Sequence, residues 1–76
     1  MDSLIKEIYD IFKMKVKFEY KSYGIHGYLT IILIENNIEK IIQALTIDEK
    51  VDNIDTLVDE YRKIILVICN KYILKN

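Results

Sequence analysis

Hydrophobic and polar positions change their period in the first half of the chain. Between Asp2 or Ser3 and about Lys13, apolar residues recur at helical spacing and lie on one face: Leu4, Ile5, Ile8, Ile11 and Phe12. From residue 16 to residue 21, apolar and charged residues alternate, as in a half-buried strand. Residues 28–34 form a more buried, β-branched run. We expect an N-terminal helix followed by a β-hairpin.

The stretch between the two expected strands contains both glycines of the chain. Gly24 and Gly27 bracket Ile25 and His26. Glycine adopts a positive φ at little cost, and tight hairpin connections need such a residue. The stretch therefore predicts a hairpin loop, with the only histidine of the chain exposed on it.

Two structures fit the next segment, Ile38 to Leu45. Its apolar residues have helical spacing: Ile38, Ile41, Ile42 and Leu45. Isoleucine also favours strands, and the segment is short, so a third antiparallel strand is the alternative. The spacing favours a short helix.

The last third of the chain carries a heptad pattern. Its apolar residues step alternately by four and three: Ile47, Val51, Ile54, Val58, Tyr61, Ile65, Ile68 and Tyr72. We expect a long helix from about residue 47 to 74, which at 1.5 Å per residue would be roughly 40 Å long. Because that exceeds the width of a compact domain of this size, either the helix breaks near Asp48–Asp52 or its end projects towards a partner.

The C-terminal half of this expected helix is apolar nearly all round. Further apolar residues lie beside the heptad positions: Leu57, Ile64, Leu66, Val67, Ile73 and Leu74. Such helices are buried from several sides. We expect one face on the sheet and the other on a second copy or a target protein. The expected oligomer seam is Val58, Tyr61, Ile65, Ile68 and Tyr72.

Composition indicates one small α+β domain spanning residues 1–76. The chain is 51% hydrophobic and has a single cysteine, so it has no internal disulfide and no four-cysteine zinc site. Its longest apolar run, Ile64 to Cys69, is far shorter than the roughly 20 residues of a membrane span. We expect a cytoplasmic protein without membrane contact that self-associates, forming a homodimer or another homo-oligomer.

Residues that could support catalysis are few. A nucleophile–histidine pair would have to use His26, and no glycine-framed elbow surrounds the nearby Ser22. Cys69 lies in an apolar run, which favours a small buried hydrophobe over a reactive thiol. We expect no catalytic residue, cofactor or metal site, and a function that is not enzymatic.

Lysines and tyrosines near the first strand form one candidate surface. The residues are Lys13, Lys15, Lys17, Lys21, Tyr23 and Tyr28. Lysines on one side of a strand, with aromatic residues nearby, can contact phosphates and stack bases. The same lysines also protect an edge strand from unwanted pairing, so direct nucleic-acid binding is the less favoured interpretation.

An acidic run forms the second candidate surface. Residues 48–60 contain six acids and one lysine, a net charge of −5, in a chain whose formal net charge is −1. The acids are Asp48, Glu49, Asp52, Asp55, Asp59 and Glu60. On one helix most of them would share a side, where they either stabilise the helix start or dock on a basic groove of another protein.

These features favour a small protein-binding module that inhibits or regulates a larger protein, docking through the acidic helical face. That larger protein could itself be an enzyme that handles nucleic acid. In size, charge layout and mixed α/β make-up, the chain resembles inhibitors that phages and mobile elements use against host defences, anti-CRISPR proteins among them. This resemblance involves no motif. The alternatives are a homodimeric nucleic-acid-binding regulator that uses the lysine strand, and a purely structural assembly module.

Overall fold

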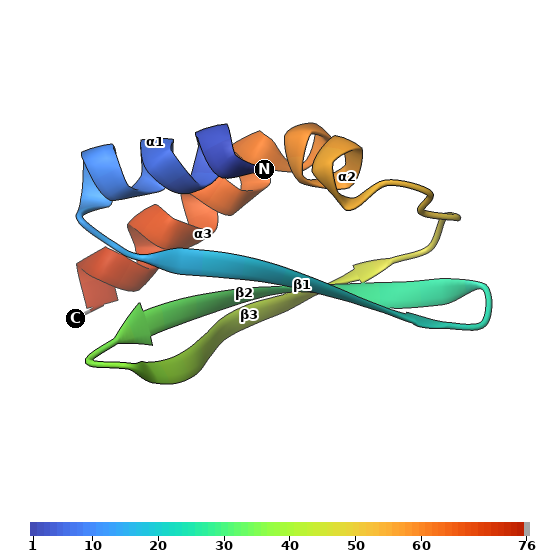
Figure 1. Ribbon diagram of the computed structural model, residues 1–76, viewed down its shortest axis with the longest axis horizontal. Helices are drawn as coiled ribbons and strands as arrows, with labels where there is room; N and C mark the ends of the chain where they lie inside the picture. Colours follow the sequence, from blue (N-terminus) through green and yellow to red (C-terminus); the bar gives the residue numbers. More distant parts are fainter. Residues whose placement is uncertain (76) are drawn as a thin grey trace.

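The computed structural model describes residues 1–75, and its elements follow the order helix, three strands, two helices. They are α1 (Asp2–Phe12), β1 (Val16–Tyr23), β2 (His26–Glu35), β3 (Ile38–Ile47), α2 (Ile54–Glu60) and α3 (Arg62–Lys75). The strands form one antiparallel sheet in the order β1-β2-β3, and the helices lie together on one of its faces (Figure 1). The predicted small α+β fold, its N-terminal helix and its β1–β2 hairpin are confirmed.

The β1–β2 connection is a two-residue turn. Tyr23 and His26 are the last paired residues, and Gly24 and Ile25 join them. Gly24 has a φ of 69°, the left-handed conformation that glycine adopts without a steric penalty. The conspicuous glycine-rich stretch of the sequence is thus principally the place where the chain reverses.

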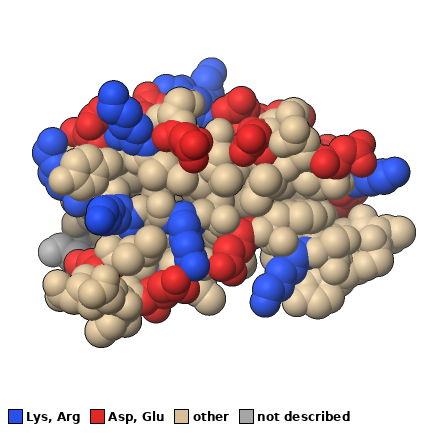
Figure 2. Space-filling model, viewed as in Figure 1, with Lys and Arg blue, Asp and Glu red and all other residues tan. Residues whose placement is uncertain are grey.

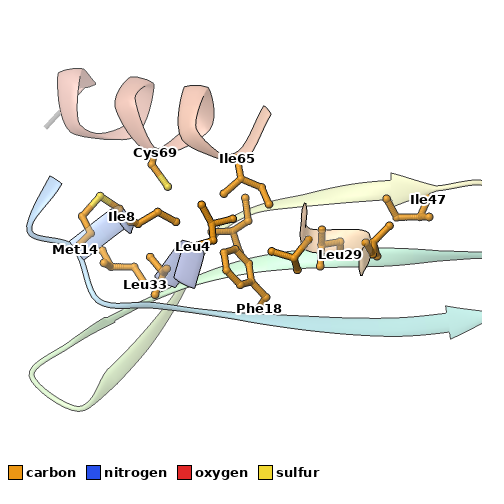
Figure 3. Close-up of a cluster of buried hydrophobic side chains, with 13 residues drawn as sticks. Leu4, Ile8, Met14, Phe18, Leu29, Leu33, Ile47, Ile65 and Cys69 are labelled. Atoms are coloured by element: carbon orange, nitrogen blue, oxygen red, sulfur yellow. The ribbon is translucent and has the colours of Figure 1, made fainter. Parts of the chain in front are cut away.

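The hydrophobic core lies between the helices and the sheet (Figure 3). Residues from every element contribute to it: Leu4, Ile8, Met14, Val16, Phe18, Leu29, Ile31, Leu33, Ile47, Leu57, Val58, Ile65 and Cys69. Among the described residues no polar side chain is buried. The fold therefore depends on apolar packing, which stabilises roughly in proportion to the area removed from water.

The helix expected over Ile38–Leu45 is wrong, because this segment is the strand β3. Asn36 and Asn37 adopt φ values of 52° and 66°, and this pair of left-handed residues turns the chain back beside β2. Ile31 pairs with Gln43 and Ile32 with Ile41, so the ladder passes over Ile42 in a β-bulge.

The bulge explains why the spacing resembled a helix. In a regular strand, side chains on one face are separated by an even number of residues. Ile42 and Leu45 are three residues apart, yet both pack against the core, because Ile42 is itself the extra residue of the bulge. The three-residue spacing that resembled a helix is therefore a consequence of the β-bulge.

The expected continuous helix over 47–74 is also wrong. Ile47 ends β3, and residues 48–53 are not helical, so the interruption near Asp48–Asp52 is the alternative that the structure supports. Helix α2 begins after Asn53, whose side-chain oxygen accepts a 2.8 Å hydrogen bond from the Asp55 N–H. At Tyr61, with φ −96° and ψ 10°, α2 ends and α3 follows directly.

The expected oligomer seam packs within a single copy of the chain. Val58 and Ile65 are fully buried in the core. Tyr61, Ile68 and Tyr72 are partly buried against the same core. Val58 and Ile65 are therefore not available to a second copy, whereas Tyr61, Ile68 and Tyr72 keep part of their surface exposed.

Candidate functional site

A groove between the edge strand β3 and helix α3 combines apolar surface with positive charge. We call it the β3–α3 groove. It has a volume of about 460 Å³ and is lined by Ile42, Gln43, Lys63, Ile64, Val67, Ile68, Lys71, Tyr72 and Lys75. Two residues come from the bulged part of β3 and the other seven from α3. No acidic residue lines it.

Two rows of side chains along α3 form one wall of the groove. Residues four apart lie above one another on a helix. The first row consists of Lys63, Val67, Lys71 and Lys75. The second row consists of Ile64, Ile68 and Tyr72. Side chains at Val67 and Ile64 are 53% and 49% exposed, so apolar surface remains open to solvent between the lysines.

Contacts with α1 determine which side of α3 is left open. Ile65 and Cys69 are fully buried in the core below α3 (Figure 3). Arg62 donates through Nε to Glu7 Oε1 at 3.0 Å, and its terminal nitrogen also contacts the other carboxylate oxygen of Glu7. This bidentate pair ties the start of α3 to α1. Because α1 and the core cover one side of α3, the side that carries Lys63, Lys71 and Lys75 lies beside β3.

No carboxylate among residues 1–75 forms an ion pair with the lysines of the groove. Ion pairs among residues 1–75 involve Lys17, Lys50, Arg62 and the N-terminal amine, and none involves Lys63, Lys71 or Lys75. At the end of the groove, Lys40 Nζ lies 5.6 Å from the centre of the Tyr72 ring, a cation–π contact. In the described part of the chain, the groove is thus an apolar surface flanked by three lysines without an ion-pair partner.

The acidic residues do not share one helical face, contrary to expectation. Asp48, Glu49 and Asp52 lie in the loop before α2, because the helix begins only at Ile54. Asp55, Asp59 and Glu60 follow on α2. All six are exposed, and acidic side chains gather over α1, α2 and the preceding loop in Figure 2. Asp48 and Glu49 line a hollow of about 500 Å³ beside the hairpin turn, together with Tyr20 and Ile25.

The lysine and tyrosine surface is also divided. Lys13 caps the C-terminus of α1 with a left-handed φ of 58°, and Lys15 lies before β1, so neither belongs to the strand. Lys17 contacts Glu39 at 2.6 Å and Glu19 at 3.3 Å, and the hydrogen bond that Lys17 donates to Glu39 raises the pKa of Lys17.

Of the remaining members, Lys21 pairs with Tyr28 across the strands. Tyr23 and Tyr28 meet edge to face, with ring centres 5.7 Å apart. The continuous row of free lysines that the sequence indicated is therefore absent from residues 13–21.

Two of the three residues considered for catalysis, His26 and Cys69, differ in their exposure to solvent. His26 is exposed at the start of β2. Cys69 is a free thiol in the core, and burial raises its pKa to about 11. Residues 1–75 contain no group of three or more His, Cys, Asp or Glu side chains arranged to hold a metal ion. None of the helices α1 to α3 is long and apolar enough to cross a membrane.

Sequence reasoning did not find the β3–α3 groove, although part of its signal was visible. The surplus of apolar residues beside the heptad positions, including Ile64 and Val67, indicated a second contact face on the last helix. The partner wall could not be predicted while Ile38–Leu45 was interpreted as a helix. Lys63, Lys71 and Lys75 belonged to neither of the two candidate surfaces.

Comparisons of this chain with protein-family models, with curated proteins and with solved structures found no match.

Proposed function

We propose that this chain is a non-enzymatic binding module that holds a segment of a larger protein in the β3–α3 groove and thereby inhibits or regulates that protein. The observation that carries the proposal is the exposure of Ile64 and Val67 between lysines that form no ion pair with any of residues 1–75. Apolar side chains grouped in a groove and rimmed by polar residues are characteristic of protein-interaction sites.

The groove is also suited to a partner by its rigidity. Its α3 wall is anchored by Ile65 and Cys69 in the core and by the Arg62–Glu7 pair. A surface held in place in this way loses little conformational entropy on binding, which favours affinity.

The acidic residues 48–60 provide a second candidate docking surface. All six carboxylates are exposed, and the two ion pairs made by this region are long: 3.9 Å between Lys50 and Asp52, and 3.7 Å between Asp55 and the N-terminal amine. These charges are therefore available to a basic surface of a partner, as an inhibitor that occupies a nucleic-acid site would require.

Site-specific photo-crosslinking in cells tests the module and distinguishes its two surfaces. A photoreactive phenylalanine analogue replaces Val67 in the groove, Asp52 on the acidic surface, or Tyr23 on the uncovered sheet face as the control. Val67 and Tyr23 are matched in exposure, at 53% and 57%. We expect a discrete crosslinked species of higher mass from position 67 and none from position 23.

Each other outcome has a definite meaning. Crosslinking from position 52 alone would move the docking site to the acidic surface and overturn the groove assignment. Crosslinking with equal yield from all three positions would indicate nonspecific contact, and the absence of any crosslink would refute the binding module. Circular dichroism of each variant checks that the substitution leaves the fold intact.

A further inference from the structure

We infer that the segment held in the β3–α3 groove is an acidic amphipathic helix of the partner protein. This inference rests on the proposed function and names the chemistry of the partner. The groove offers an apolar centre at Ile42, Ile64 and Val67, with lysines along its α3 side. An amphipathic helix with carboxylates beside its apolar face complements both features.

The spacing of the lysines agrees with the spacing of carboxylates on a helix. Lys71 and Lys75 are one turn apart on α3, about 6 Å, and Lys63 and Lys71 are two turns apart, about 12 Å. Acidic residues at positions i, i+8 and i+12 of a partner helix repeat with the same intervals. A helix lying roughly along α3 could therefore place one carboxylate near each lysine.

The backbone of β3 argues against a partner that adds a strand. An extended peptide would need a regular row of free N–H and C=O groups along this edge. At the groove, the β-bulge at Ile42 interrupts the ladder, and bulges reduce the ability of an edge to pair. The groove therefore favours recognition through side chains, which is how a helix binds.

A second copy of this chain is a poorer occupant than a separate partner, although its residues 48–60 are acidic. Three of those acids lie in a loop. Helix α2, which has seven residues, has its apolar residues Leu57 and Val58 buried in its own core. Helix α2 of a second copy thus offers carboxylates without a free apolar face.

The test measures binding of designed fluorescent peptides to the full chain by anisotropy. The probe is a helical peptide of about 16 residues, with leucine at positions i, i+3, i+4 and i+7 and glutamate on the flanks. A matched peptide replaces every glutamate by lysine. We expect the acidic peptide to bind, the basic peptide to bind at least tenfold more weakly, and added salt to weaken the acidic complex.

Two groove variants and one control locate the binding site. Lys71→Glu reverses a charge in the groove, and Lys21→Glu makes the same change on the uncovered sheet face. Val67→Glu places a charge on the apolar surface. We expect Lys71→Glu and Val67→Glu each to weaken binding of the acidic peptide about tenfold or more, and Lys21→Glu to change it less than twofold.

Equal affinity for both peptides would overturn the inference, as would equal losses in Lys71→Glu and Lys21→Glu. Tighter binding of a single-stranded oligonucleotide to the same lysines would overturn it in favour of phosphate recognition. Self-association lost in Lys71→Glu would replace the partner by a second copy. If position 67 crosslinks to a partner but the acidic peptide does not bind, the proposed binding function is supported and the inference of an acidic helix is refuted.

Discussion

Lys17 Nζ lies 2.6 Å from Glu39 Oε2, and this ion pair joins the two edge strands of the sheet across the middle strand. Lys17 is paired with Ile32 in the ladder, so its side chain passes over that residue on the way from β1 to β3. Ile32 is only 5% exposed although it does not belong to the core cluster between the helices and the sheet. The stem of a lysine can cover apolar surface while its amine remains in water.

Two substitutions of Lys17 separate the contribution of its charge from the contribution of its apolar stem. Lys17→Met keeps an unbranched apolar stem and removes the charge, whereas Lys17→Ala removes both. We expect Lys17→Ala to destabilise the fold more than Lys17→Met, because it also exposes Ile32. Urea unfolding at neutral pH measures the difference, and equal stabilities would show that the stem does not protect Ile32.

The pH dependence of the same pair has a definite sign. The hydrogen bond that Lys17 donates to the Glu39 carboxylate raises the pKa of Lys17 above its ordinary 10.5. Its stabilisation is therefore complete below pH 10.5 and is lost as pH rises through the higher pKa of the folded state. The stability difference between wild type and Lys17→Met should shrink at strongly alkaline pH. A difference that persists there would exclude the charge as its cause.

Gly27 is a second position with a strict steric requirement. A Cβ on this residue would lie 2.5 Å from the Lys21 carbonyl oxygen and 2.5 Å from the Tyr20 hydroxyl oxygen. We expect Gly27→Ala to destabilise the fold by about 1–3 kcal/mol, the usual cost of overpacking. Thermal or urea unfolding measures the change.

Gly24→Ala is the matched control at the turn. A Cβ there would meet nothing within 4 Å, so the only penalty comes from the φ of 69°. That penalty is about 1 kcal/mol. Adding Tyr20→Leu should offset part of the Gly27→Ala effect and none of the Gly24→Ala effect. If the losses of stability are additive in the double variants of Tyr20→Leu with Gly27→Ala and with Gly24→Ala, the new Cβ at position 27 does not clash with the Tyr20 ring.

The Cys69 thiol reports on opening of the core. Burial raises its pKa from 9.0 to about 11, so the thiol remains protonated in the folded chain where an unfolded chain would ionise it. Because the folded state then binds the extra proton, this contribution to stability declines as pH rises from about 9 to 11. Cys69→Ala should remove that part of the alkaline decline.

Reaction with a thiol reagent at mildly alkaline pH provides the direct measurement. We expect native protein to react slowly, at a rate set by opening of the core, and urea-unfolded protein to react at once. Ile65→Ala, which removes a fully buried neighbour on α3, should destabilise the chain by about 2–5 kcal/mol and speed the labelling. Rapid labelling of the native wild type would contradict the buried position of Cys69.

Local patterns were sufficient for α1 and the β1–β2 hairpin. In α1 the apolar residues recur at the period of a helix, and in β1 they alternate from Val16 to Tyr20. Of the two residues that join β1 to β2, Gly24 is the one with a positive φ. Here the local preference and the burial required by the core agree, and prediction succeeds for that reason.

Predictions failed where a neighbouring element changed the meaning of the pattern. Ile42 and Leu45 share a face only because a bulge forms when β3 pairs with β2. The heptad continues through Ile47 and Val51, yet pairing with Gly27 makes Ile47 the end of a strand. Whether such a segment becomes a strand depends on residues that are distant in the sequence, and periodicity within one segment contains no information about them.

The order of residues was enough to predict the fold class, the apolar core of the first two strands, the acidic character of residues 48–60 and the surplus of apolar residues on the last helix. Which of those apolar residues remain exposed depends on the packing of elements that are distant in the chain. The heptad residues Val58 and Ile65 became core, while Ile64 and Val67 were left beside β3. Burial is decided by the element that packs opposite, and the β3–α3 groove exists because β3 is a strand at the edge of the sheet.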